Sequence, residues 1–408
     1  MSAVAEPLQH ALIDDHLAHR NAMVLAVAQA LGGANNVIIY STASIIGAVI
    51  APNKGLATLP ITCMVIGMWL GTLPVGALAR RFGRRAALQI GSTFGIVSGL
   101  ISYSAVISNN FWLLLLGGFC GGLYAASQQS YRFTATDTAS ENYRPKVVSW
   151  VLAGGVFAAL LGPQMVIVTK DLLPPYLFAA SYLGQSTLAV IATIVLLFVK
   201  VPPVVSKHTD GVRPLMEIIR NPRFIVAVAC GVASYSMMNL VMTAAPLAMV
   251  GCGHSVNDAA LGIQWHVIGM FAPSFLTGSL IARYGIERIT GIGLAMIGLT
   301  AVIAVTGLSV AHFWSALVLL GVGWNFSFIG ATTMVTQTHR PQERTKVQSF
   351  NDFLIFGSMA LSSFSSGQLL AYFGWTAVAE VIFPIIFIAG AFLAWLVMRN
   401  RAARTEAV

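Results

Sequence analysis

Side chains that bind soft metals recur at four-residue spacing within one stretch of the chain, residues 224–281. Met238 and Met242 fall in one predicted helix, and His266 and Met270 fall in the next. Residues four apart share one face of a helix, about 6 Å apart along its axis. Thioether sulfur selects soft metals, above all Cu(I), and imidazole also suits copper. The four side chains therefore predict a copper site.

The two helices that carry these residues must run antiparallel, because a short connection joins them. If each helix is centred in a membrane, Met238 lies at the depth of Met270, and Met242 at the depth of His266. A methionine pair in an apolar helix is by itself more often packing. His266 is the only one of eight histidines deep inside an apolar span. An ionisable side chain is costly there and functional by default, so His266 carries the prediction.

The composition is that of a membrane protein. Charged residues make up 9% of the 408 residues and apolar residues 57%, whereas a soluble domain has about 25% charged residues. Apolar runs of about twenty residues recur along the chain, and each can cross ~30 Å of hydrocarbon. We predict an all-α membrane protein with twelve transmembrane helices. No nucleophile–base set or phosphate-binding loop is present, so we expect neither an enzyme nor a prosthetic group.

The net charge of +9 reports topology, and its distribution argues against nucleic-acid binding. Of the 23 Lys and Arg residues, only Lys54 and Lys170 fall in loops that we place outside the cell. Positive charge concentrates on the cytoplasmic side of membrane proteins. We therefore expect a multi-pass protein of the bacterial inner membrane, surrounded by the lipid bilayer, with both termini in the cytoplasm.

The two halves of the chain repeat each other at an offset of 202 residues. The segment 65–68 reappears as 267–270, and Gly76, Arg81 and Gly83 have counterparts at the same offset. Such a repeat predicts two six-helix bundles duplicated head to tail. The predicted parts are a cytoplasmic tail (1–21), an N-terminal bundle (22–201), a cytoplasmic linker (202–223), a C-terminal bundle (224–398) and a second tail (399–408).

The stretch Gly76-Ala-Leu-Ala-Arg-Arg-Phe-Gly-Arg-Arg85 resembles the cytoplasmic loop signature of the major facilitator superfamily. The resemblance covers essentially the whole chain. It implies the major facilitator fold, with twelve transmembrane helices in two pseudo-symmetric six-helix bundles, and transport by alternating access. In the family the residue at the position of Arg80 is usually Asp, which pairs with an Arg to steady one gating state. In this chain Asp137 or Glu141 is the candidate carboxylate for that ion pair, called the latch below. The implied gating residues are Gly76, Arg80, Arg81, Gly83, Arg84 and Arg85.

The two metal-binding motifs, together with Trp324-Asn325, resemble the CcoA-like (CalT) copper importers of bacteria. That resemblance implies that Met238, Met242, His266 and Met270 are the copper ligands. It also implies a monomeric secondary active transporter that imports copper, as Cu(I), for cytochrome oxidase assembly and delivers it to a copper chaperone. In this reading copper is the transported substrate. Close relatives without the metal motifs are associated with riboflavin.

The repeat and the remaining polar residues add a pathway around this site. Subtracting 202 from His266 and Met270 leads to Met64 and Met68, which predicts a second, weaker thioether pair. Cys230 and Cys252 lie about 33 Å apart if their helix is straight. We therefore expect no disulfide between them, and they are candidates for passing metal at the two mouths of the pathway. The predicted cavity-lining residues are Asn36, Tyr40, Tyr235, Asn239, Gln264, Trp265 and Asn325.

Three other functions remain open. The first is an organic-solute importer of the same branch, which would carry a riboflavin-like aromatic vitamin. Its pocket would be lined by Tyr40, Tyr124, Tyr235, Trp265, Trp324 and Asn325. The second is a proton-coupled drug exporter, although the sequence offers no carboxylate at mid-membrane for it. The third is a copper sensor, which would need a large cytoplasmic output domain that the sequence lacks.

Overall fold

Helices account for the secondary structure throughout the described parts of the chain. The computed structural model describes residues 14–140, 142–201 and 213–405. Within these ranges it does not describe the side chains of Arg80, Pro145, Pro341, Thr345 and residues 403–405. Part of the predicted tail (1–13), Glu141 and part of the predicted linker (202–212) lie outside the described residues.

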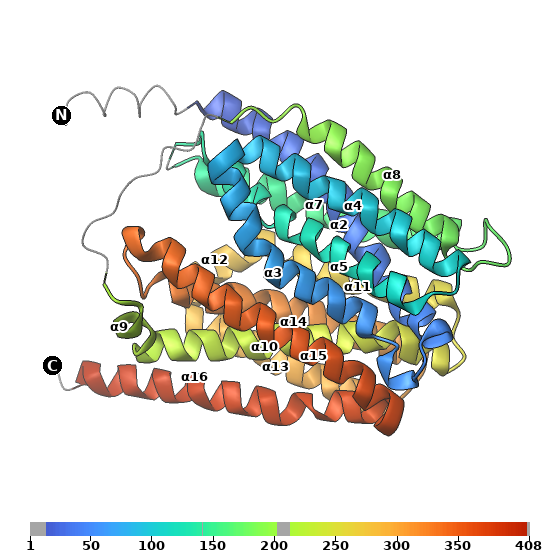
Figure 1. Ribbon diagram of the computed structural model, residues 1–408. Helices are drawn as coiled ribbons and strands as arrows, with labels where there is room; N and C mark the ends of the chain where they lie inside the picture. Colours follow the sequence, from blue (N-terminus) through green and yellow to red (C-terminus); the bar gives the residue numbers. More distant parts are fainter. Residues whose placement is uncertain (1–13, 141, 202–212, 406–408) are drawn as a thin grey trace. The chain divides into compact units, whose positions relative to one another are not determined.

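Contacts divide the chain into two compact units (Figure 1). Unit 1 comprises residues 1–50 and 63–206, and unit 2 comprises residues 51–62 and 207–408. Unit 1 contains α2 (Asp15–Ile50), most of α3 (Leu59–Phe82), α4 (Arg84–Ile107), α5 (Phe111–Gln128), α6 (Tyr131–Thr136), α7 (Arg144–Thr169) and α8 (Ala179–Leu196). Unit 2 contains η1 (Lys54–Leu56), α9 (Leu215–Ile219), α10 (Pro222–Gly251), α11 (Val256–Phe271), α12 (Ser274–Tyr284), α13 (Ile286–Thr306), α14 (Val310–Thr336), η2 (Pro341–Glu343), α15 (Arg344–Glu380) and α16 (Ile382–Thr405).

The helices are long and apolar enough to form a polytopic membrane protein. Among the described residues, ten helical runs could cross a membrane, and the bent pair α11 and α12 makes eleven. One of the ten is the 57-residue run Lys346–Ala402, about 85 Å long as a straight helix and nearly three times the ~30 Å hydrocarbon core. This run comprises α15 and α16, and Gly374 interrupts it with φ 80°. Counting it as two spans gives twelve, and the all-α membrane fold is confirmed.

In unit 1, α2 is the helix that the others pack around. It contacts α4, α5, α6, α7 and α8. Near its start, the Asn21 amide donates to the Lys200 carbonyl oxygen at 2.7 Å and accepts from the Lys200 N–H at 3.1 Å. In its middle, Asn35 and Gln185 of α8 exchange side-chain and backbone hydrogen bonds. Buried amides on α2 therefore fix the position of α8 and of the segment that follows it.

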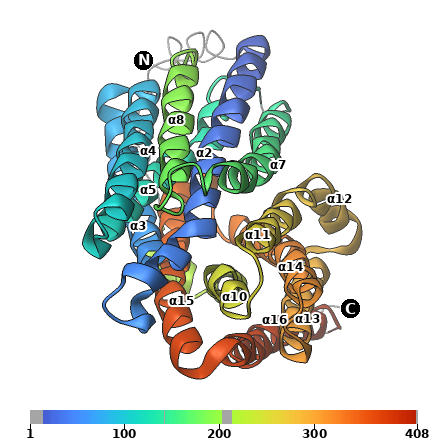
Figure 2. The same cartoon turned by 90° about the vertical axis from the view of Figure 1, so that its right-hand side faces the viewer.

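In unit 2, α10 occupies the corresponding central place. Figure 2 views this unit nearly end-on and shows α10 surrounded by α11, α13, α14, α15 and α16, all of which it contacts. The apolar part of α10 is 78% buried, the largest share among the candidate spans. The helix that carries Met238 and Met242 is therefore enclosed by protein on nearly all sides.

Glycine makes the same one-residue turn in both halves of the repeat. Gly83 separates α3 from α4 with φ 85°, and Gly285 separates α12 from α13 with φ 90°. Positive φ strains residues that carry a Cβ, so glycine is required at both places. The stretch from Gly76 to Arg85 resembles a loop signature, but α3 continues to Phe82 and α4 starts at Arg84. The signature is thus mostly helical, because a single glycine is enough to reverse the chain.

The span formed by α11 and α12 is bent by 41°. Pro273 lies at the break, and since proline has no N–H, the carbonyl four residues earlier loses its helical partner. The Asn325 amide nitrogen on α14 donates to the Met270 carbonyl and to Ser274 Oγ, both at 2.6 Å. Its oxygen accepts from Thr277 Oγ1 at 2.6 Å. Asn325, predicted to line the cavity, therefore holds the two helix segments at their break.

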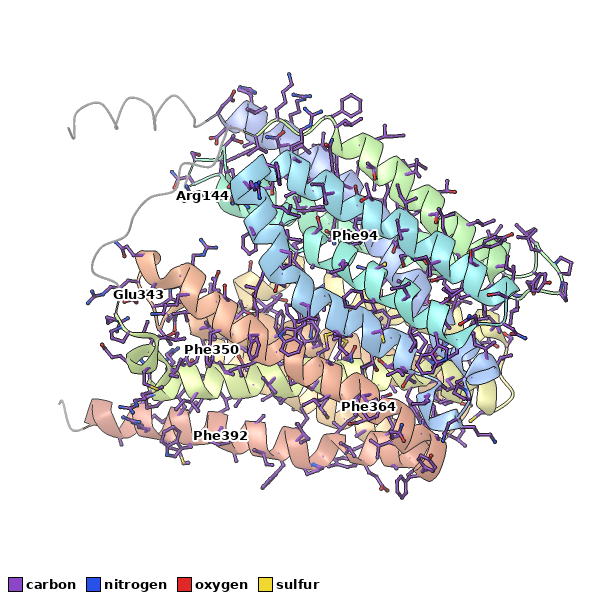
Figure 3. The ribbon with its side chains drawn as sticks, viewed as in Figure 1. Phe94, Arg144, Glu343, Phe350, Phe364 and Phe392 are labelled. Atoms are coloured by element: carbon purple, nitrogen blue, oxygen red, sulfur yellow. The ribbon has the colours of Figure 1, made fainter. Side chains whose placement is uncertain are left out.

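The end of the predicted linker is fixed to the turn before α15. Arg213 binds Glu343 through two side-chain hydrogen bonds of 2.8 and 2.7 Å, and the Arg340 N–H donates to Glu343 at 2.8 Å. Glu343 lies at the start of α15, beside α9 (Figures 1 and 3). These hydrogen bonds, above all those from Arg213, lower the pKa of Glu343 from 4.5 to about 2. Glu343 is therefore ionised at any working pH.

Candidate transport site

His266 is held in an orientation that suits a metal ligand. The side chain is fully buried on α11, and its Nδ1 lies 2.8 Å from the Leu317 carbonyl oxygen on α14. A carbonyl oxygen only accepts hydrogen bonds, so Nδ1 carries the hydrogen. In the neutral ring Nε2 then keeps its lone pair, and it has no hydrogen-bond partner among the described residues. Fixing one ring nitrogen by a backbone carbonyl is the usual support for a histidine that binds metal through the other.

The three methionines of the predicted copper site are all buried within unit 2. Met238 and Met242 are 2% and 5% exposed on α10, and Met270 is 7% exposed on α11, just before the break. The loop between α10 and α11 spans only four residues. Counted from that loop, Met242 lies about 14 Å and His266 about 15 Å along their helices, at 1.5 Å per residue. No three His, Cys, Asp or Glu side chains of the described part of the chain form a metal-binding group, so a metal site here depends on thioethers.

Met64 and Met68, the predicted second thioether pair, are buried on α3 in unit 1. The α3 backbone at these residues lies against Gly122 of α5. A Cβ added at Gly122 would meet the Met64 carbonyl oxygen and lie 2.7 Å from the Met68 nitrogen. The backbone of this methionine pair is therefore part of a close helix contact.

The two cysteines of the predicted pathway have different surroundings. Cys230 is fully buried, and its sulfur lies 3.9 Å from the Ala389 carbonyl oxygen of α16. Cys252 is exposed at the end of α10. All four cysteines are free thiols. Of the two cysteines of the predicted pathway, Cys252 is exposed and Cys230 is not.

Other predicted lining residues on α10 and α11 lie in different environments. The Asn239 amide donates to the Met359 carbonyl oxygen at 3.1 Å and to Ser362 Oγ at 3.3 Å, which ties α10 to α15. Gln264 is buried, whereas the neighbouring Trp265 is 42% exposed. Residues 264–266 thus present alternating buried and exposed side chains on α11.

A compact aromatic cluster lies on three helices of unit 2. Trp324 and Phe328, one turn apart on α14, stack at 5.1 Å with an interplanar angle of 12°. Tyr235 of α10 meets both edge-to-face, at 5.2 and 4.9 Å, and Phe356 of α15 at 6.1 Å. The Trp324 indole N–H is buried without a partner among the described residues. The cluster offers aromatic faces and one unused donor, which is the surface that a planar aromatic solute needs.

Unit 1 contains a polar site that the sequence analysis identified only in part. Asn36 on α2 donates through Nδ2 to Gln128 Oε1 on α5 at 2.9 Å. Asn36 Oδ1 and Gln128 Nε2 are both buried and have no hydrogen-bond partner among the described residues. Leaving a buried donor or acceptor unpaired costs about 1–3 kcal/mol. Tyr40, a predicted lining residue of the same helix, is also buried.

Gln128 was missed because we gave weight to motifs and to titratable side chains. Its signal in the sequence is an amide at the end of an otherwise apolar span, four residues after Tyr124 and therefore on the same helix face. Tyr124 is fully buried, and its hydroxyl neighbours that of Tyr131. Sequence alone does not reveal that Asn36 meets Gln128.

The predicted gating residues lie along the end of α3 and the start of α4. Gly76 and Arg81 belong to α3, Gly83 forms the turn, and Arg84 and Arg85 begin α4. Arg81 covers the ring of its neighbour Phe82, and Arg85 is exposed. The Arg80 side chain lies outside the described part.

Arg84 forms an ion pair with Asp137, one of the two carboxylates that we considered as latch partners. Burial raises the pKa of Asp137 above its ordinary 3.8, and the neighbouring Arg84 opposes this shift. The other candidate, Glu141, lies outside the described residues. Within unit 1, an arginine of the signature thus pairs with a carboxylate that follows α6.

Comparison with known proteins places this geometry in a family. The model of the Major Facilitator Superfamily matches residues 25–362 and 230–407. The riboflavin transporter RfnT of Brucella anthropi is 48% identical over 379 residues, which cover 92% of this chain and 95% of the relative. The uncharacterized MFS-type transporter YddS of Bacillus subtilis is 27% identical over 395 residues, 92% of this chain and 88% of the relative.

Solved structures agree on the fold. A point mutant of the nucleoside transporter NupG superposes with a TM-score of 0.71 at 13% identity, covering 93% of this chain and 99% of that one. A D-xylose–proton symporter superposes with a TM-score of 0.73 at 14% identity, covering 91% and 96%. The predicted superfamily is confirmed. The narrower prediction of a copper importer receives no support, since the 48% identical relative is a riboflavin transporter. The chain is a membrane transporter, not an enzyme, and it belongs to the major facilitator superfamily.

Proposed function

We propose that this chain takes up a riboflavin-like solute, a planar aromatic ring system with polar edges and a polyhydroxyl chain. The observation that carries the proposal is the 48% identity to a riboflavin transporter over nearly the full length of both proteins. This replaces copper import as the leading function, and the organic-solute importer that we kept as an alternative becomes the main one.

The chemistry of both units supports an organic solute. The cluster of Tyr235, Trp324, Phe328 and Phe356 supplies aromatic surface and the free Trp324 N–H. Asn36 and Gln128 supply buried hydrogen-bonding groups. The break between α11 and α12 is the kind of discontinuity that borders solute sites in secondary transporters. Alternating access, the mechanism that the family resemblance implies, would then carry the solute across the membrane.

Copper remains a second candidate because of one specific observation. His266 Nε2 is buried without a partner, among the described residues, on a ring that Leu317 orients, and three buried thioethers occur on the same helix pair. Thioether and imidazole ligands favour Cu(I). The groups proposed for the organic solute belong to other residues, Tyr235, Trp324, Asn36 and Gln128, so the two functions can be tested separately.

The test measures both substrates in one set of cells. A bacterial strain that cannot make riboflavin, expressing this chain, should accumulate labelled riboflavin well above cells with an empty vector, and excess unlabelled riboflavin should compete. Total cell copper is measured in parallel. The variants are His266→Leu and Met238→Leu/Met242→Leu. The matched control is Met237→Leu, which changes a buried methionine of α10 outside the motif.

We expect riboflavin uptake by the motif variants to stay within about twofold of the unmodified chain, as for sites without shared partners. If copper is also carried, both motif variants lose copper accumulation and Met237→Leu keeps it. Riboflavin uptake at the empty-vector level, with the chain present in the membrane, contradicts the proposed function. Cell copper that is indifferent to expression and to every variant removes the second candidate.

A further inference from the structure

The amide pair in unit 1 has the hydrogen-bonding pattern of a recognition site. We propose that Asn36 and Gln128 bind the imide edge of the solute's ring system, where a C=O group lies next to an N–H group. This inference rests on the proposed function and names the part of the solute that unit 1 recognises.

The pattern follows from counting the groups of the two amides. Each primary amide has one carbonyl oxygen and one NH₂ group. The pair uses Asn36 Nδ2 and Gln128 Oε1 in its mutual hydrogen bond. The acceptor Asn36 Oδ1 and the donor Gln128 Nε2 remain, both buried and without a partner in the described structure. Turning both amides over together would again leave one acceptor and one donor, so the pattern does not depend on which way round the pair lies.

Another amide pair in unit 1 provides a contrast. Asn35 and Gln185 also meet in the interior, but the nitrogen atoms of both side chains donate hydrogen bonds, to Gln185 O, to Asn35 Oδ1 and to Ser98 Oγ. Only one carbonyl oxygen of this pair, Gln185 Oε1, is left over among the described residues. That pair ties α2 to α8 and α4. The pair of Asn36 and Gln128 is different because it leaves a donor and an acceptor side by side.

The space beside this pair depends on a glycine. A Cβ added at Gly32 of α2 would lie 2.7 Å from Gln128 Nε2 and 2.8 Å from the Tyr124 hydroxyl oxygen. The absence of a side chain at Gly32 therefore leaves the room that the Gln128 amide occupies, and a methyl group there would press directly on the donor. The free atoms are enclosed in this conformation, so the solute reaches them when the transport cycle opens unit 1.

The solute group that matches this acceptor and donor is organic and is not a cation. The N–H of an imide donates to Asn36 Oδ1, and the adjacent C=O accepts from Gln128 Nε2. The Gln128 N–H donor repels a metal ion, and Asn36 Oδ1 is a hard oxygen ligand that suits Cu(I) poorly, so this pair favours an organic group over copper. A flavin ring system carries such an imide, with its N–H between two carbonyl groups.

The experiment compares riboflavin with N3-methylriboflavin, in which a methyl group replaces the imide hydrogen. Uptake of both is measured in the full-length chain and in Asn36→Leu, Gln128→Leu and Gly32→Ala. Gln129→Leu is the matched control, since Gln129 is the next residue along and lies outside the amide pair. Membrane content and thermal stability are recorded for each variant.

We expect the unmodified chain to prefer riboflavin by about tenfold or more, because a site that pairs a substrate N–H strongly rejects an analogue without it. In Asn36→Leu this preference should fall close to one. Gln128→Leu and Gly32→Ala should lower riboflavin uptake by about tenfold, while Gln129→Leu leaves both uptake and preference unchanged.

The possible failures are distinguishable. Uptake of neither flavin by the unmodified chain contradicts the proposed function itself. Equal uptake of both flavins by the unmodified chain contradicts this inference alone. Asn36→Leu that loses uptake but keeps the preference also contradicts it, because the residue then acts through folding. The ratio of the two uptakes is the deciding quantity, since a merely less stable variant lowers both rates together.

Discussion

Two close contacts between helices, one in each unit, have similar backbone geometry but carry different side chains. In unit 1, α3 lies against Gly122 of α5 through the Met64 oxygen and the Met68 nitrogen. In unit 2, α11 lies against Gly321 of α14 through the oxygen of His266 and the nitrogen of Met270, which are the repeat counterparts of Met64 and Met68. The backbone contact is thus present in both halves, while the side chains differ.

The difference lies one turn further along. Unit 1 has Gly71, and α3 continues as one helix to Phe82. The counterpart of Gly71 at the same offset is Pro273, where unit 2 breaks its helix by 41°. A proline removes one hydrogen bond and breaks the helix, and Asn325 supplies donors and an acceptor at the break. Unit 1 thus keeps α3 as one helix although it contains Pro74, whereas the unit 2 span is bent at Pro273, where Asn325 binds both segments.

Side chains at other positions related by the repeat also differ between the two halves. Asn36 of unit 1 has Met238 as its counterpart, and Met64 has His266. Unit 1 thus has the amide of Asn36 where unit 2 has the thioether of Met238. It has the thioether of Met64 where unit 2 has the imidazole of His266. The repeat fixes where side chains can project, and it leaves open which substrate they bind.

The largest expected effect comes from blocking the shared contact. Gly122→Ala and Gly321→Ala each place a Cβ on the backbone of a neighbouring helix, which cannot move aside as a side chain does. Overpacking costs about 1–3 kcal/mol or more, so both variants should lower the yield and melting temperature of the membrane-inserted protein. Gly390→Ala is the control, because no atom of the described structure lies within 4 Å of its added Cβ. Two unaffected glycine variants would show that the contacts are looser than the structure has them.

A smaller effect is expected from Asn325→Leu, which acts only on the broken helix. The change leaves the Met270 carbonyl and the hydroxyls of Ser274 and Thr277 without their shared partner. We expect a loss of about 1–3 kcal/mol in the free energy of unfolding, measured by thermal or denaturant unfolding in detergent. The transport rate should fall by a larger factor than the amount of folded protein does, since the break is where unit 2 can bend. Unchanged stability and transport would mean that Pro273 alone maintains the bend.

The smallest effects concern two ion pairs, Arg213–Glu343 and Arg84–Asp137, and they have opposite signs. Arg213 lowers the pKa of Glu343 from 4.5 to about 2, so the stability that this carboxylate contributes is complete above pH 4.5 and is lost as the pH falls through 2. Burial raises the pKa of Asp137 above 3.8, so the Asp137 carboxyl stays protonated to a higher pH in the folded chain than in the unfolded chain. The free energy of unfolding therefore decreases as the pH rises from 3.8 through the pKa of the folded state.

Thermal unfolding between about pH 3 and pH 7 tests this contrast. Glu343→Gln should remove the loss of stability on the acid side, and Asp137→Asn should remove the decrease on the alkaline side of 3.8. If both substitutions change the pH profile in the same direction, the environments of the two carboxylates are not opposite.

The sequence predicted the fold well because its signals are local. Hydropathy alone located the spans, and the offset of 202 paired Gly83 with Gly285, which both adopt positive φ. The site was predicted only in part. The soft-ligand motif predicted copper, whereas the relative of 48% identity is a riboflavin transporter, because the same helix spacing serves either packing or binding.

The sequence by itself predicted an all-α membrane protein whose halves repeat, since periodicity, apolar length and repetition can all be counted along the chain, and the resemblance of its loop signature predicted the transporter family. Only the tertiary structure decided which polar and soft side chains have partners. Asn36 meets Gln128 across 92 residues, and His266 meets Leu317 across 51. Whether a buried donor or acceptor is already used depends on such distant neighbours, and that is the physical reason why the fold could be predicted from the sequence and the binding chemistry could not.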